Sequence, residues 1–158
     1  MKLNLDINLL AGDLIEVRSS FLHGSMEDQN FRRELAISLG PTTVNLIDKC
    51  DLTIKRRFCC ICNFLERRLS NRFANLSPGC KLSVELLISS NSREIIIFSI
   101  LGQGDMGVEL LSQITKFMRS TGSKFILINY VNSGEFPDLA IFNPVAIKHA
   151  NIEKNRNS

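Results

Sequence analysis

Tryptophan is absent from this sequence of 158 residues, and only one tyrosine is present. Proteins that bind single-stranded nucleic acid stack the bases on aromatic side chains, so this shortage argues against that function. An excess of one charge is also lacking, because 19 Lys and Arg face 16 Asp and Glu for a net charge of +3. So small an excess does not indicate nucleic acid or an anionic membrane as the partner.

Long apolar runs are lacking as well, and none reaches the ~18 residues that a membrane span requires. The first dozen residues contain Lys2 and Asp6 and do not resemble a signal peptide. The cysteine count is five, an odd number, which predicts reduced thiols in a cytoplasmic protein. The spacing of Cys60-Ile-Cys62 is not typical of zinc sites and no histidine is near, so we expect buried thiols and no metal.

The amino-terminal region predicts two helices. In Ile7–Leu22, apolar residues recur at helical spacing with charged residues between them, which indicates an amphipathic helix. A second helix is expected over Glu27–Leu39, because Gly40-Pro41 is a strong stop signal. Thr42–Ile47 is β-prone but short. Residues 1–41 are therefore predicted to form a helical hairpin.

The rest of the chain alternates helical and strand patterns. A strongly periodic helix with a basic face is expected over Ile54–Leu76, ended by Ser77-Pro78-Gly79. The later elements are expected in this order: strands Lys81–Ser89 and Glu94–Leu101, a helix Val108–Ser120, and strands Lys124–Val131 and Leu139–Phe142. From His149 the chain reads as a polar tail.

These patterns predict the α+β class. The helical hairpin would be followed, over residues 42–148, by a two-layer α/β sandwich in which helices cover one mixed sheet. Residues 149–158 would form the polar tail.

One stretch resembles the ATP-binding domain of histidine kinases and their relatives in the GHKL superfamily. Arg67–Gly79 is similar to the family's Asn-containing box, with Asn71 at the position of the Mg²⁺-binding Asn. Ile96–Gly104 resembles the strand and glycine loop that receive adenine, and Gly107–Gly134 resembles the family's last helix, strand and turn. The glycines that carry the likeness are Gly102, Gly104 and Gly107.

The departures from that family concern nucleotide binding. Ile100 stands where the family has the Asp that bonds adenine, and Ile cannot accept a hydrogen bond. The family's lid is missing, because Gly104 and Gly107 are three residues apart. We therefore expect no ATP and no other cofactor.

A lidless domain of this kind, joined to a helical hairpin, resembles the bacterial ChpT-type histidine phosphotransferases of two-component phosphorelays. The resemblance implies a homodimer that binds response-regulator receiver domains, and the basic face of the 54–76 helix would suit their acidic pockets. Leu9–Leu22 looks like the family's first helix, but Glu16 stands where the phospho-accepting His would be and Val17 replaces its acidic neighbour. His23 is the remaining candidate for phosphotransfer, which needs a nucleophilic imidazole.

Whether the protein is an enzyme is therefore open, and two alternatives remain. Gln103–Gly107 is similar to the acyl-CoA loop of GNAT acetyltransferases, although its spacing differs. A small interaction module without a reaction is the other alternative. The backbone around Gly102–Gly107 should distinguish the histidine-kinase-like domain from a GNAT enzyme, because GNAT enzymes splay two parallel strands at this point.

Overall fold

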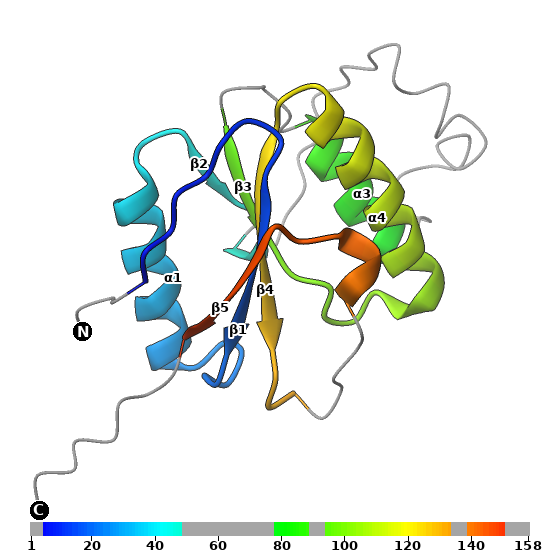
Figure 1. Ribbon diagram of the computed structural model, residues 1–158. Helices are drawn as coiled ribbons and strands as arrows, with labels where there is room; N and C mark the ends of the chain where they lie inside the picture. Colours follow the sequence, from blue (N-terminus) through cyan, green and yellow to red (C-terminus); the bar gives the residue numbers. More distant parts are fainter. Residues whose placement is uncertain (1–4, 49–77, 89–93, 134–138, 151–158) are drawn as a thin grey trace, which may run out of the picture.

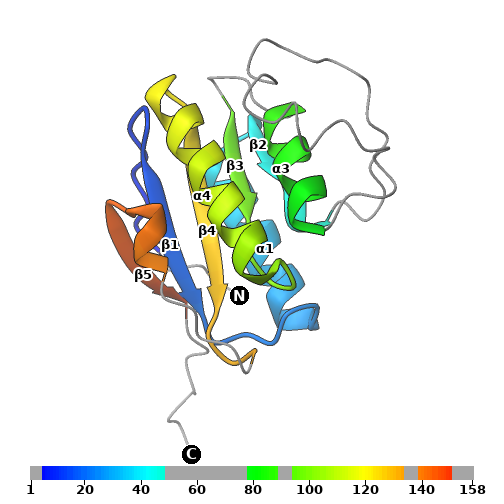
Figure 2. The same ribbon diagram turned by 90° about the vertical axis from the view of Figure 1, so that its right-hand side faces the viewer.

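The computed structural model describes residues 5–48, 78–88, 94–133 and 139–150. They form one sheet with helices on both faces (Figures 1 and 2). The strands are β1 (Leu14–Ser19), β2 (Thr43–Asn45), β3 (Ile95–Phe98), β4 (Lys124–Tyr130) and β5 (Ala146–Ala150). The helices are α1 (Met26–Leu39), α3 (Pro78–Ile88) and α4 (Gly104–Ser120), with 3-10 turns η1 (Leu46–Asp48) and η3 (Leu139–Phe142).

The strand order is β2-β3-β4-β1-β5, and all four pairings are parallel. Parallel strands need crossover connections, and these are almost always right-handed. The step from β1 to β2 runs one way along the sheet, whereas the steps to β3, β4 and β5 run the other way. Right-handed crossovers therefore put α1 on one face and α3, α4 and η3 on the other, as Figure 1 shows.

Each face of the sheet has its own apolar core. Phe31 and Leu35 of α1 pack on one face, against Val17, Ile97 and Ile128. The opposite core lies under α3, α4 and η3 and is the larger; its sheet residues are Leu14, Ile96, Phe98, Phe125 and Leu127. Burial of both faces explains why β3 reads as the unbroken apolar run Ile95–Phe98.

The structure confirms part of the predicted order. The helix predicted over Glu27–Leu39 is α1, and the strands predicted over Glu94–Leu101 and Lys124–Val131 contain β3 and β4. The predicted helix Val108–Ser120 is α4, which begins earlier, at Gly104. The short β-prone segment is β2. The predicted helix Ile54–Leu76 lies outside the described residues.

The amino-terminal helix prediction is wrong, because Leu14–Ser19 is strand β1. Leu14 and Val17 are three residues apart and would share one face of a helix, but they lie on opposite faces of the sheet. A strand that is buried on both sides cannot be distinguished from a helix by periodicity alone. The helical hairpin is therefore not confirmed: α1 is the one helix described within residues 5–41.

Two further elements differ from the prediction. The segment predicted as the strand Lys81–Ser89 is helix α3, which starts at Pro78. The prediction used Pro78 as a helix stop, whereas proline is favoured at the first position of a helix because that position needs no N–H donor. Leu139–Phe142 is a 3-10 turn, and the last strand is β5, which includes His149 of the predicted tail.

The layering also differs from the prediction. Among the described residues the sheet is parallel throughout and has helices on both faces, so the expected mixed sheet covered on one side is wrong. No helix in the described ranges is both long enough and apolar enough to cross a membrane.

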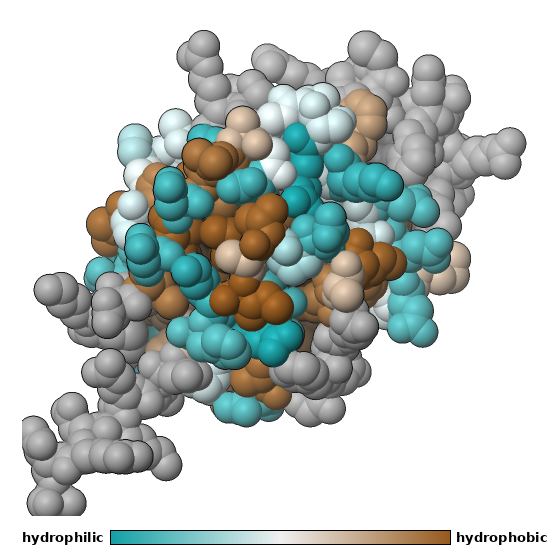
Figure 3. Space-filling view, in the orientation of Figure 1, coloured by the Kyte–Doolittle hydropathy of each residue, from teal (hydrophilic) through white to brown (hydrophobic). Residues whose placement is uncertain are grey.

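The two edges of the sheet have different surfaces. β5 forms the edge nearest the viewer in Figure 1, and apolar side chains are interspersed among polar ones on the same face in Figure 3. Ile141, Val145 and Ile147 are the exposed large apolar residues in and around β5. The β2 edge lies beside α1, and residues of both line a hollow between them.

Helices α3 and α4 approach each other closely near their amino termini, where each carries a glycine. A Cβ added to Gly79 would lie 2.6 Å from the Cα of Gly107. A Cβ on Gly107 would lie 3.1 Å from both the Gly79 Cα and the Gln103 Cβ. Neither position has room for a side chain, so the two glycines set the distance between the helices.

Gly79→Ala should therefore lower the melting temperature by roughly 5 °C, through an overpacking cost of about 1–3 kcal/mol. Intrinsic propensity has the opposite sign, since Ala is favoured over Gly in a helix by about 1 kcal/mol. The control is Gln113→Ala at an exposed site on α4, which should change the melting temperature by less than about 1 °C. Equal melting of wild type and Gly79→Ala would contradict the close approach.

Candidate functional site

The carboxyl ends of β1 and β4 lie side by side and are the place in the sheet where a ligand site is most expected. These neighbouring strands send their connections to opposite faces: the chain goes from β1 to α1 and from β4 to η3. Open parallel sheets bind ligands in the crevice at such a switch point. Here the segments at the ends of the two strands are bonded to each other: Asn132 Nδ2 donates to the Ser20 carbonyl at 2.8 Å, and the Val131 N–H donates to the Ser19 carbonyl at 3.1 Å.

His23 and Tyr130 meet at this switch point. Tyr130 ends β4 and is 2% exposed, and the exposed His23 lies in the loop after β1. Their rings meet edge to face with centroids 4.9 Å apart. The contact holds the imidazole at the carboxyl edge of the sheet while leaving part of it open to solvent.

A buried carboxylate, Asp28 in the first turn of α1, fastens the loop that carries His23. Its Oδ2 accepts the Gly24 N–H at 3.0 Å and the Arg32 Nε–H at 3.2 Å. Its own N–H donates to the Oγ of the N-cap residue Ser25 at 3.2 Å. Asp28 and Arg32 are both nearly inaccessible to solvent. This charged pair therefore sets where α1 begins and how the loop enters it.

Tyr130 lies next to this pair. Neither its hydroxyl nor Asp28 Oδ1 has a partner with hydrogen-bonding geometry in the described part of the chain. Burial raises the pKa of Tyr130 far above its usual range. The charge of the Asp28 carboxylate and its capacity to accept the phenolic proton raise the pKa further, while Arg32 acts in the opposite direction. The neutral phenol is therefore the form that the fold favours.

A small pocket opens at the same edge of the sheet, with a volume of about 180 Å³. We call it the carboxyl-edge pocket. Its lining comes from the ends of β1, β2 and β3 and from α3: His23, Leu46, Ile47, Leu82, Ser99, Leu101 and Gln103. Gln103 is the N-cap residue of α4, but its side chain makes no capping hydrogen bond. Its Oε1 has no hydrogen-bond partner among the residues the structure describes.

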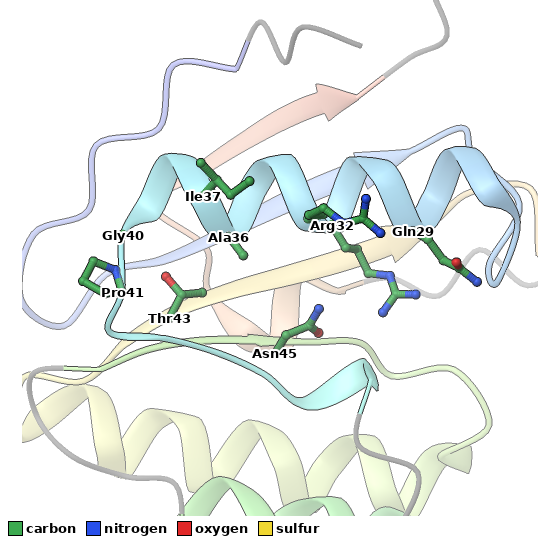
Figure 4. Close-up of a pocket in the computed structure, with 9 residues that line it drawn as sticks. Gln29, Arg32, Ala36, Ile37, Gly40, Pro41, Thr43 and Asn45 are labelled. Carbon is green, nitrogen blue, oxygen red and sulfur yellow. The ribbon is translucent and has the colours of Figure 1, made fainter.

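A larger hollow, of about 720 Å³, lies between α1 and the edge strand β2 (Figure 4). We call it the α1/β2 groove. It is lined by Gln29, Arg32, Arg33, Ala36, Ile37, Gly40, Pro41, Thr43 and Asn45. Arg33 is exposed and Ile37 is 67% exposed, so one wall offers both a cation and an apolar side chain. On the opposite wall, the Thr43 hydroxyl is buried and has no partner within the described ranges.

The structure brings together some of the predicted site residues and separates others. His23 lies at the carboxyl-edge pocket together with Gln103, and Gln103 is flanked by Gly102 and Gly104. Gly107 is not in a loop, because α4 begins at Gly104 and Gly107 packs on α3. Asn71 lies outside the described residues.

The surroundings of Glu16 differ from those that a phospho-accepting residue needs. It lies within β1, 2% exposed, and its Oε2 accepts the Arg18 Nε–H at 2.6 Å. It points to the face opposite α1, since it alternates with Ile15 and Val17. A buried, ion-paired carboxylate in a strand does not take the place of an exposed histidine on a helix.

Sequence analysis missed Asp28, Arg32, Tyr130 and Ser99. One signal was present: Ser25 followed three residues later by Asp28 fits a helix-capping box and marks the start of α1. The other contacts join distant parts of the chain, and no local pattern indicates them. Among the described residues no cluster of three His, Cys, Asp or Glu side chains could hold a metal ion.

The fold and the site together define a parallel α/β domain with a small pocket at the carboxyl edge of its sheet. No protein-family model, no curated protein and no solved structure matches this chain.

Removing the Asp28 carboxylate should destabilise the protein strongly, because Arg32 loses its buried ion-pair partner. We expect Asp28→Asn to lower the free energy of unfolding by about 3 kcal/mol in a denaturant titration. Glu27→Gln is the matched control, since Glu27 is exposed in the same helical turn, and it should lie within about 0.5 kcal/mol of wild type. Similar losses for the two variants would show that Asp28 has no special role.

The raised pKa of Tyr130 predicts that the free energy of unfolding falls at alkaline pH. Because its pKa is raised by folding, its contribution is complete below the unfolded pKa of about 10 and is lost as pH rises above that value. As the only tyrosine in a chain without tryptophan, it is the sole source of a phenolate absorbance signal. That signal should appear only when circular dichroism reports unfolding. A phenolate that titrates near pH 10 in a folded protein would contradict this environment.

Proposed function

We propose that this protein acts by recognising another protein and does not itself relay a phosphoryl group. The observation that carries the proposal is the α1/β2 groove. It is open, it is large enough to receive a protruding side chain or a peptide segment, and it mixes the Arg33 cation with the exposed Ile37. Arginine is enriched at the centre of protein interfaces because its planar group pairs with carboxylates.

The resemblance to histidine phosphotransferases makes a receiver domain the first partner to test. Receivers carry an acidic phosphorylation pocket, and Arg33 supplies a complementary charge at the groove. The burial and ion pairing of Glu16 support recognition without relay, because this position would carry the phospho-accepting group.

The acetyltransferase alternative expects two neighbouring parallel strands to separate beside the glycine loop. β3 and β4 instead pair along the whole of β3, from Ile95 opposite Lys124 to Phe98 opposite Leu127. This pairing favours recognition over acyl transfer. The homodimer implied by the resemblance stays a prediction, and the exposed apolar residues around β5 are the surface we assign to it.

The test is binding to a panel of isolated receiver domains, each with and without beryllium fluoride as the phosphoryl mimic. We expect at least one to bind with a micromolar dissociation constant. Arg33→Glu should weaken that binding at least tenfold, which corresponds to about 1.4 kcal/mol. Lys116→Glu is the matched control, because Lys116 is an exposed cation on α4, on the opposite face of the sheet, and its reversal should leave the affinity unchanged.

Two results would count against the proposal. Binding by no receiver, or binding equally sensitive to both charge reversals, would remove the groove as the recognition surface. Transfer of an acid-labile phosphoryl label from a phosphorylated receiver, lost in His23→Ala, would show that the protein does relay phosphate.

A further inference from the structure

We propose that the carboxyl-edge pocket binds a small, uncharged, monocyclic carboxamide or a heteroaromatic ring with the same donor and acceptor pattern. The site is separate from the α1/β2 groove and goes beyond the recognition function proposed above. It is built from side chains that the recognition function does not use.

The position of the pocket supports a ligand site. Its lining combines the segments that follow the carboxyl ends of β1, β2 and β3, and parallel α/β sheets bind their ligands at this edge. His23 places the pocket next to the switch point between β1 and β4, through its contact with Tyr130. Asp28 fastens the loop that carries His23, so this wall of the pocket is held in place without a ligand.

The lining selects the chemical class. Leu46, Ile47, Leu82 and Leu101 provide apolar walls, and none of the lining residues that the structure describes is Asp, Glu, Lys or Arg. These described residues supply no permanent charge, so an ionic ligand would lose its hydration without gaining a fixed opposite charge from them. The ligand is therefore uncharged, with an apolar body.

Three polar side chains of the pocket have unused hydrogen-bonding capacity. Gln103 Oε1 is an acceptor without a partner in the described part of the chain, and the only bond of its Nε2 is a long one, 3.4 Å, to the Leu101 carbonyl. Within the same described ranges, the Ser99 hydroxyl and the His23 ring nitrogens also make no hydrogen bond. Pockets that bind small molecules typically combine apolar walls with a few convergent polar groups of this kind.

Binding requires the Gln103 amide to turn, because its Oε1 is enclosed near Gly79 and Gly107. The terminal torsion of glutamine has a broad minimum. The turn gives up one long hydrogen bond, from Nε2 to the Leu101 carbonyl at 3.4 Å, while Oε1 gives up none. A carboxamide then matches the three side chains: its N–H donates to Gln103 Oε1 or to His23, and its carbonyl accepts from Ser99.

The volume sets the size of the ligand. About 180 Å³ equals the share of about six water molecules at ~30 Å³ each. This is room for one substituted six-membered ring, and it is too small for a nucleotide. A ligand of this size binds weakly, and we expect a dissociation constant on the order of 1 mM.

The test compares benzamide with two relatives of nearly the same shape: acetophenone, in which a methyl replaces the amide nitrogen, and benzoate, which is charged. Chemical-shift titration of the labelled protein should move resonances of the pocket residues with benzamide. Acetophenone and benzoate should bind at least tenfold more weakly. This comparison uses the wild-type chain and so does not depend on any variant folding correctly.

Variants then locate the site. Gln103→Leu, Ser99→Ala and His23→Ala should each weaken benzamide binding fivefold or more, and Gln103→Leu should abolish the preference over acetophenone. Gln113→Leu, an exposed change on α4, is the control and should have no effect. Absence of benzamide binding at 20-fold the expected constant of about 1 mM, equal binding of the three compounds, or affinity insensitive to all three pocket variants would overturn the proposal.

Discussion

A parallel sheet must bury both of its faces. In this chain β1 shows the requirement clearly, because it lies between β4 and β5 with Leu14 in the core on one face and Val17 in the core on the other. One amphipathic helix cannot cover two faces. The right-handed crossovers solve this by sending α1 to one side and α3, α4 and η3 to the other. The opposite directions of these connections put the switch point between β1 and β4, and the contact of His23 with Tyr130 places the carboxyl-edge pocket beside it.

At the carboxyl edge, the polar groups that hold the fold together are separate from those that could bind a ligand. Asp28 and Arg32 pair with each other beneath the surface, and Tyr130 is held next to them as a neutral phenol. His23, one residue before Gly24, is secured by these buried groups but remains exposed. The buried pair holds the wall of the pocket and takes no part in its recognition chemistry.

Local patterns predicted the elements whose signals are local. α1 has a capping residue and a glycine stop, α4 has a strong amphipathic period, and β3 and β4 are apolar runs. The errors arise where two structures share one pattern. β1 has helical spacing because both of its faces are buried, and Pro78 marks the start of a helix as readily as the end of one.

The site was less predictable than the fold. His23 could be identified as an unusual residue, and the loop of Gln103 was identified by its glycines. Their meeting depends on strand order, since His23 follows β1 while Ser99 and Gln103 follow β3. Local sequence patterns do not indicate the strand order, because it is set by contacts between residues far apart in the chain. The resemblance to the GHKL domain rests on the order of the elements and on Asn71, Gly102, Gly104 and Gly107. Neither the parallel sheet nor its two covered faces follow from that likeness.

The strand order also has a consequence for how the chain folds during synthesis. β1 leaves the ribosome long before either of its partners: β4 pairs Phe125 with Leu14, and β5 pairs Ala146 with Ile15. The amino-terminal strand therefore has no neighbour in the sheet until more than one hundred further residues have been made. Pairings so distant in sequence slow folding and leave an apolar strand unprotected meanwhile. The strands of this sheet therefore cannot pair in the order of their synthesis, and β1 joins it only after β4 has been made.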